Sequence, residues 1–220
     1  MPQYCACKAK NSIIHCLSCK KGGYVNLRHN ALRDGIANIM KEVCKDVRTE
    51  PALLPVEPNR FSNSHTTSAD GARLDISVCG LRSTFEYTYF DVRVCHSDAV
   101  SNVTLSHEEL LKRNEKEKRD LYEERVREVE KASFSPMVFL TSGGVGPECN
   151  SVLKRVAHLI ADKRGEEYSH VINFIRTKLR FSLLKSTLMA VRGNRGKPHF
   201  EPNVGLIAFN CIPRSGVYDS

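Results

Sequence analysis

The sequence of 220 residues contains no apolar run long enough to cross a membrane. Its first residues also lack the charged, apolar and small-residue pattern of a secretory signal. We therefore expect a soluble, intracellular protein without a membrane partner. The nine cysteines are an odd number, and without a secretory signal metal binding or burial explains them better than a disulfide framework.

The sequence also has no internal repeat, and the glycine pair of TSGGVG at 141–146 matches neither a phosphate-binding loop nor a dinucleotide fingerprint. A turn between a strand and a helix explains this segment. Hydrophobic content of 41% and charged content of 26% are ordinary for a globular protein, which argues against wholesale disorder. The length suffices for one main domain with a small appended module.

Positive charge is concentrated at the two ends of the chain. The formal net charge is +8, and residues 163–199 hold nine lysines or arginines against two glutamates. Residues 1–50 hold nine against four acids. This distribution is typical of a protein that binds DNA or RNA around an acidic, metal-holding centre, although basic helices that only solvate the surface explain it equally well.

Hydrophobic periodicity predicts an α/β fold, a central mixed sheet flanked by helices. Apolar residues at helical spacing predict helices over 27–44, 107–131, 152–163 and 168–191. Strand patterns fall at 45–56, 72–78 and 87–94, and a buried strand at 133–146 runs into the glycine-rich turn. We divide the chain into a small module at 1–23, a main domain at 24–192 and a loosely ordered tail at 193–220.

Two of the predicted strands, 72–78 and 87–94, each carry an acid within an apolar pattern. Because residues i and i+2 of a strand share a face, Asp91 and Arg93 project together. If the strands are neighbours, Asp75 and Asp91 can converge on one divalent metal ion, with the Arg93 charge near a phosphate. These are the groups that metal-assisted phosphodiester hydrolysis uses. The alternative is a surface hairpin with solvated acids.

The N-terminal segment has the composition of a zinc site with four ligands, Cys5, Cys7, His15 and Cys19. If residues 14–20 are helical, His15 and Cys19 lie on one face, and the Cys5 and Cys7 pair comes from a turn. The spacing is tighter than in common zinc fingers, and a frayed terminus with incidental cysteines is the alternative.

Two helices offer further polar side chains. Lys118 and Tyr122 share a face, where the lysine can stabilise developing negative charge and the tyrosine can hold a phosphate oxygen; a solvated surface is the alternative. Arg28, His29 and Asn30 begin the first long helix, where a DNA phosphate or the scissile group can bind. His29 can equally cap, pack or ligate the neighbouring metal. Asp34 lies on the edge of the same helix that we expect to face the sheet.

The order of these motifs resembles the C-terminal region of site-specific non-LTR retrotransposon proteins. In that family a CCHC zinc knuckle precedes a restriction-like endonuclease of the PD-(D/E)XK class. The resemblance covers roughly residues 5–192, and related transposon-derived open reading frames show it too. It is carried by the compact cysteine and histidine pattern followed by GGYVNLRHNALRD, DGARLDI, YFDVRV and NEKEKRDLYEERV.

The resemblance implies a role for each matching position. Asp75 and Asp91 would bind Mg²⁺ or Mn²⁺, Asp34 would be a helix-borne metal-binding acid, and Lys118 would act as the helical lysine of the retrotransposon branch. The zinc knuckle corresponds to the four cysteine and histidine ligands named above and would hold structural Zn²⁺. The chain departs from the pattern at Leu74, where the class has proline, and at Arg93, where it has lysine.

The predicted function is therefore a metal-dependent DNA endonuclease that nicks target DNA and derives from a retrotransposon. The alternative is a catalytically inactive nucleic-acid-binding remnant of the same fold. Basic side chains of the C-terminal helices would grip the nucleic acid, namely Arg176, Lys178 and Arg180. We expect a reverse-transcriptase region to be encoded elsewhere, and a nuclear location if the protein is functional or a cytoplasmic one otherwise.

Overall fold

The computed structural model describes residues 3–57, 60–99 and 101–193. Most of the tail predicted at 193–220 therefore lies outside the described residues. The helices are α1 (Ile13–Ser18), α2 (Tyr24–Met40), α3 (His107–Arg125), the π-helical turn η1 (Val126–Glu130), α4 (Pro147–Arg164) and α5 (Tyr168–Arg192). The strands are β1 (Lys45–Thr49), β2 (Ile76–Cys79), β3 (Tyr87–Cys95) and β4 (Ser133–Leu140).

The four strands form one mixed sheet in the order β1-β2-β3-β4. The first three are antiparallel neighbours, with Ile76 opposite Phe90, whereas β3 and β4 run parallel with Asp91 opposite Pro136. A parallel pair needs a crossover connection, which α3 supplies. The predicted α/β fold with a central mixed sheet flanked by helices is confirmed, and the two acid-bearing segments are neighbours as expected.

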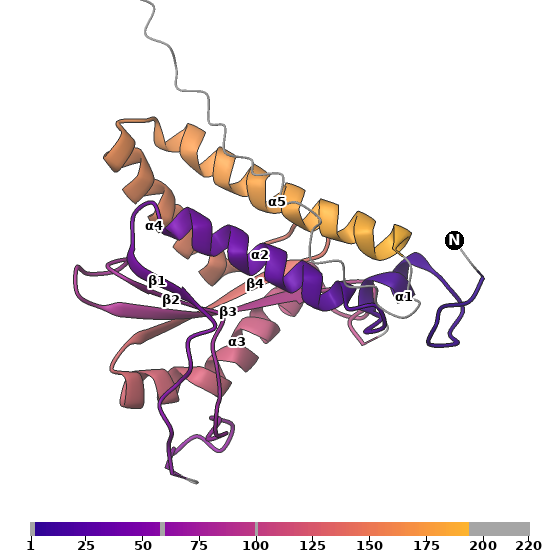
Figure 1. Ribbon diagram of the computed structural model, residues 1–220, viewed down its shortest axis with the longest axis horizontal. Coiled ribbons are helices and arrows are strands. Elements are labelled where there is room, and N and C mark those ends of the chain that lie inside the picture. The colour runs from indigo at the N-terminus through magenta and orange to yellow at the C-terminus, as the bar shows by residue number, and fades with distance from the viewer. Residues whose placement is uncertain (1–2, 58–59, 100, 194–220) are drawn as a thin grey trace, which may run out of the picture.

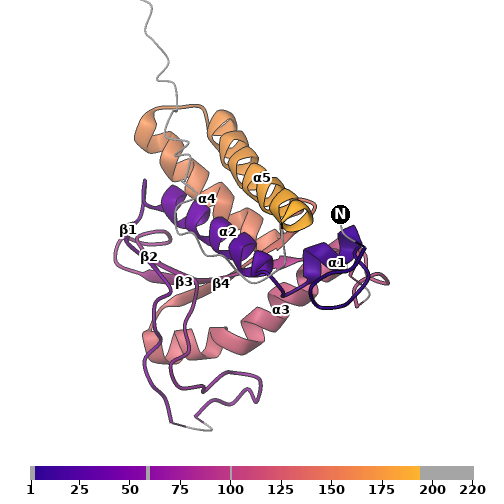
Figure 2. The same ribbon diagram turned by 45° about the vertical axis from the view of Figure 1, so that its right-hand side comes forward.

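Helices cover the two faces of the sheet unequally, as Figures 1 and 2 show. On one face α2, α4 and α5 pack against β2, β3 and β4. The main hydrophobic core lies there and includes Leu32, Phe90, Val156 and Ile175. On the other face α3 packs against β4 through smaller apolar clusters. Because alternate residues of β3 point to opposite faces, Phe90 and Val92 enter the main core and Asp91 points toward α3.

Helix ends differ from the predicted ranges where caps override periodicity. The structure begins α2 at Tyr24 because Gly23 takes a left-handed backbone (φ +70°) as the N-cap. Gly165 (φ +66°) ends α4 in the same conformation, as its position after a helical pattern indicates. The predicted strand 45–56 shrinks to β1, since proline at positions 51 and 55 supplies no backbone donor for a ladder.

A long loop between β1 and β2 is held in place by Arg125, whose side chain is completely buried. The guanidinium donates to the carbonyl oxygens of Thr67 (3.0 Å), Ala69 (3.1 Å) and Leu54 (3.0 Å). This places the segment before β2, and with it Asp75, at a fixed position beside α3. Among the described residues, no helix has the length and apolar character needed to span a bilayer.

Candidate functional site

A cluster of four side chains lies beside α1, formed by Cys5, Cys7, His15 and Cys19 and here called the cysteine–histidine cluster. Their ligand atoms all lie within 4.8 Å of one another. The sulfur of Cys19 is 3.8 Å from that of Cys5 and 3.9 Å from that of Cys7. Four ligands around Zn²⁺ at a Zn–S distance of about 2.3 Å have sulfur atoms about 3.8 Å apart, so the spacing fits tetrahedral zinc.

The local backbone explains how so short a segment gathers four ligands. Ser12 caps α1 by accepting the backbone N–H of His15 (3.1 Å), and Cys19 is the C-cap, one residue beyond the helix. The condition considered from the sequence, a helix over 14–20, is met only as far as Ser18, and Cys19 follows as the cap. The Cys5 N–H binds the Ala9 carbonyl (2.9 Å), a tight turn that brings Cys7 within 3.3 Å of His15 Nε2.

The surroundings of the cluster favour the thiolate form at one cysteine and the thiol form at another. A hydrogen bond from the Cys7 backbone lowers the pKa of the Cys5 thiol to about 6, and contacts with His15 and the other cysteines add to this effect. Burial instead raises the pKa of Cys19. A thiolate is the form that binds metal, so the cluster can hold a metal ion in a manner consistent with structural zinc.

A second group of polar side chains lies between the sheet and α3. It consists of Asp75, Asp91 and Lys118, here called the acid–lysine centre. Asp91 lies inside β3 with 6% of its surface exposed, and Lys118 Nζ is 2.8 Å from its Oδ2. Burial raises the pKa of the Asp91 carboxyl, the Lys118 charge opposes the rise, and the Asp75 charge adds to it. The centre is therefore a buried ion pair beside a second acid.

Asp75 immediately precedes β2 and is held on three sides. Its backbone N–H donates to the Phe90 carbonyl (3.0 Å), and its Oδ2 accepts the Val92 N–H (2.6 Å). Its Oδ1 lies 2.9 Å from His29 Nε2, and this hydrogen bond raises the pKa of the His29 imidazole. Asp75 therefore bonds the backbone on both sides of Asp91, which fixes the two acids beside each other.

From the sequence, His29 was expected to contact nucleic acid, to cap the helix, to pack in the core or to ligate zinc. In the structure its partner is Asp75, which the sequence did not indicate. The adjacent Arg28 is 3% exposed and donates to the Leu17 carbonyl (3.1 Å). Burial lowers the pKa of this guanidinium. The buried Arg28 side chain links α1 to α2, so it does not suit a phosphate contact. Asn30 is half-buried on α2.

Arg93 and Tyr122 flank the acid–lysine centre. Arg93 Nη1 is 2.7 Å from Glu117 Oε2, so its charge is already paired on the surface of α3. Glu117 was not singled out by the sequence, because nothing distinguishes it from the other acids of this charged helix. The Tyr122 ring lies 5.6 Å from Lys118 Nζ, and burial raises the pKa of its hydroxyl.

The remaining predicted residues lie away from this centre. Asp34 is exposed and binds Arg33 Nε at 2.8 Å. Among the described residues, the one group of three or more histidine, cysteine or acidic ligands close enough to share an ion is the cysteine–histidine cluster. On α5, Arg176 donates to Asn150 Oδ1 (3.0 Å), and Lys178 Nζ lies 5.8 Å from the Phe174 ring centre.

No protein-family model matches the chain. A search of curated proteins likewise finds no match.

Proposed function

We propose that the protein is a metal-dependent DNA endonuclease of the restriction-like class, derived from a retrotransposon. The observation that carries the proposal is the acid–lysine centre. A buried acid paired with a lysine, beside a second acid fixed by the same strand, is the arrangement that metal-assisted phosphodiester hydrolysis needs.

The topology supports a restriction-like core. Asp91 lies in β3 and Asp75 immediately precedes the antiparallel neighbour β2, and α3 then crosses over to the parallel strand β4. Lys118 reaches the site from the crossover helix, four residues before Tyr122, as the resemblance implies. Helix and strand therefore deliver the three groups from separate segments to one place, which is typical of a catalytic site.

We propose that Asp75 and Asp91 would hold a hard divalent cation such as Mg²⁺ or Mn²⁺. Mg²⁺ is commonly bound by one or two carboxylates and keeps several waters, so Asp75 and Asp91 suffice as protein ligands without Asp34. The repulsion between the two acids, which helps to raise the pKa of Asp91, would be relieved by a bound cation. When bound, such an ion polarises the phosphate and activates water.

The side chains of the chain itself would divide the remaining work. Lys118 is placed to stabilise negative charge that develops on a phosphate, and His29 orients Asp75. The Tyr122 hydroxyl can hold a phosphate oxygen. Arg93 shares its charge with Glu117, and arginine cannot act as a base near neutral pH, so we assign the cationic role to Lys118.

We further propose that the cysteine–histidine cluster holds structural Zn²⁺ and forms part of the nucleic-acid surface, together with basic side chains of α5. Arg28 on α2 binds the Leu17 carbonyl of α1, and His29 on the same helix binds Asp75. Helix α2 therefore connects the N-terminal module to the acid–lysine centre. Electrostatic contacts with DNA phosphates would make the affinity fall steeply with salt. A separately encoded reverse-transcriptase region and nuclear location belong to the same proposal.

The decisive experiment is nicking of supercoiled plasmid with Mg²⁺ or Mn²⁺. Asp91→Asn, which keeps the shape of the side chain, should lose nicking by at least about a hundredfold while retaining DNA affinity. Asp162→Asn, an exposed acid on α4, is the matched control and should cut like the wild type. Undiminished nicking by folded Asp91→Asn protein would exclude the assignment.

A second candidate is a nucleic-acid-binding remnant that does not cut. The observation that favours it is the state of two predicted site residues, since Arg93 is paired with Glu117 and Asp34 with Arg33. This candidate predicts salt-sensitive binding of DNA or RNA and no metal-dependent product from the wild type. Nicking that disappears in Asp91→Asn would eliminate it.

A further inference from the structure

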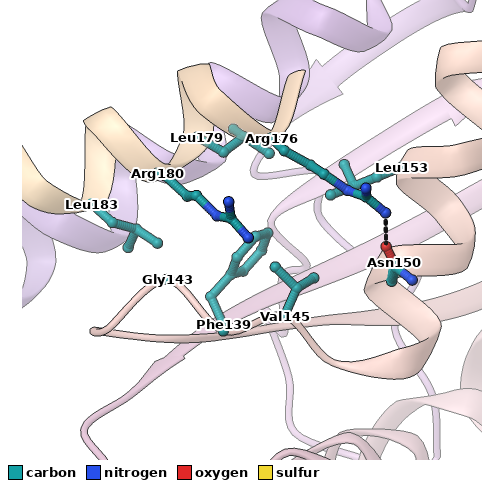
Figure 3. Close-up of a pocket in the computed structure, with 10 residues that line it drawn as sticks. Phe139, Gly143, Val145, Asn150, Leu153, Arg176, Leu179, Arg180 and Leu183 are labelled. Carbon is teal, nitrogen blue, oxygen red and sulfur yellow. Dashed lines mark hydrogen bonds between the residues drawn. The ribbon is translucent and has the colours of Figure 1, made fainter. Parts of the chain in front are cut away.

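A cavity of about 240 Å³ lies between α5 and the turn that joins β4 to α4. Figure 3 shows Arg180 reaching from α5 toward Phe139 and Arg176 reaching toward Asn150 on α4, with Gly143 at the edge. The cavity is lined by residues of β4, α4, α5 and the turn, and neither Asp75 nor Asp91 is among them. It is therefore separate from the acid–lysine centre.

The charge of the lining is entirely positive. Arg176 and Arg180 are four residues apart on one helix, which places their guanidinium groups on the same face. No acidic side chain is among the described lining residues, and neither arginine forms an ion pair with a described residue. Two guanidinium groups facing one cavity without a carboxylate favour an anion.

One of the two arginines, Arg176, is hydrogen-bonded to the cavity wall. Asn150 Oδ1 accepts a hydrogen bond from Arg176 (3.0 Å), which orients that guanidinium toward the cavity. The turn is closed by bonds from the Leu140 N–H to the Gly144 carbonyl (2.8 Å) and from the Gly143 N–H to the Leu140 carbonyl (2.9 Å). Because Arg176 and the turn are positioned before a ligand binds, they lose little conformational entropy on binding.

Two glycines shape this turn in different ways. Gly143 has a φ of +93°, a conformation that other residues rarely adopt. At Gly144 an added Cβ would lie 2.8 Å from the Leu140 side chain. The turn lies close to α5, since an added Cβ at Gly143 would be in van der Waals contact with Arg180 Cγ at 3.5 Å.

We propose that this cavity binds a phosphate monoester or inorganic phosphate through Arg176 and Arg180. Guanidinium groups bind phosphate oxygens in pairs of hydrogen bonds, and a dianion would balance the two charges. The volume is below the roughly 300–1,000 Å³ of drug-sized ligand sites, so a single phosphate group fits better than a whole cofactor. The ligand is either free phosphate or the terminal phosphate of a nucleic-acid strand, and binding does not depend on nuclease activity.

The test is calorimetric titration of the full chain with inorganic phosphate at constant ionic strength. Wild type should bind saturably, and Arg176→Gln and Arg180→Gln should each weaken binding by about tenfold or more, as expected for a lost charge-assisted hydrogen bond. Lys154→Gln removes the same charge from an exposed position on α4 outside the lining, so binding should stay within about twofold of wild type.

Thermal denaturation separates misfolding from lost binding, because phosphate should raise the melting temperature of wild type and Lys154→Gln but not of the two arginine variants. Absence of saturable binding by wild type, or equal loss in all three variants, would overturn the proposal.

Competition by short oligonucleotides identifies the source of the phosphate. If a 5′-phosphorylated strand displaces phosphate and the same strand with a 5′-hydroxyl does not, the ligand is a strand end. If neither strand displaces it while wild type still binds inorganic phosphate, the ligand is free phosphate. Displacement by both strands to the same extent in wild type and in Arg180→Gln would show only general attraction to a basic surface and would overturn the proposal.

Discussion

Replacement of Lys118 by methionine tests the electrostatics of the acid–lysine centre directly. Methionine preserves most of the side-chain length but removes the cation that lies 2.8 Å from Asp91 Oδ2. Asp91 is 6% exposed and cannot recover the lost interaction by hydration, so an unpaired buried carboxylate remains. The perturbation is therefore the loss of one partner from a largely buried ion pair.

The expected loss in the free energy of unfolding follows from how deeply the ion pair is buried. Removal of one partner from a buried pair costs about 3–5 kcal/mol, and the 19% exposure of the Lys118 side chain places this pair near the lower value, at about 3 kcal/mol. Simultaneous replacement by Asp91→Asn and Lys118→Met should recover most of that loss, because no charge is left unpaired. The assay is urea denaturation at neutral pH without added Mg²⁺.

The loss should depend on pH in a defined direction. Burial raises the pKa of Asp91 above its ordinary 3.8, so the folded state binds the proton more tightly than the unfolded state. The difference between wild type and Lys118→Met should be largest at neutral pH and shrink as pH falls through the raised pKa. Lys116→Met, an exposed position on the same helix, should cause little change at any pH.

The reasoning would be refuted if Lys118→Met lost no more stability than Lys116→Met at neutral pH. It would also be refuted if the loss stayed constant between neutral pH and pH 4, because an unpaired Asp91 must then contribute nothing.

Three further predictions concern other parts of the molecule. About one equivalent of zinc should co-purify under reducing conditions, and Cys19→Ser should remove it, as atomic absorption measures. Arg125→Met should lower the free energy of unfolding by about 3 kcal/mol, because three carbonyl oxygens lose a buried charged donor; an undiminished urea midpoint would contradict this. Hydrogen bonds from Ser62, Asn63 and Thr66 lower the pKa of Glu124 to about 2, so Glu124→Gln should destabilise the protein above pH 4.5. That difference should vanish as pH falls toward 2, which denaturation at several pH values measures.

The helices could be predicted from the sequence because their apolar residues recur with helical spacing, but not all of their ends could. α3 ends at Arg125 and passes into the π-helical turn η1, although the charged pattern continues to Lys131. A periodic pattern does not record whether the backbone bonds change from i−4 to i−5.

In the candidate site too, the sequence predicted local features but not contacts between distant segments. Period-two alternation correctly predicted that Asp91 and Arg93 face the same side, and both pair with α3. The burial of Arg28 could have been inferred, since it lies four residues before Leu32 and eight before Ile36 on the buried stripe of α2. The contact between His29 and Asp75 could not, because the two residues are 46 positions apart and no periodicity links them.

The sequence alone determined which residues could form strands and helices, because these depend on periodicity within a few residues. It also determined the composition of the cysteine–histidine cluster. The tertiary structure decided which charges meet: Lys118 reaches Asp91, Glu117 takes Arg93, and Asp34 stays with Arg33. Such pairings depend on how α2 and α3 lie across the sheet, and long-range packing rather than local preference sets that arrangement.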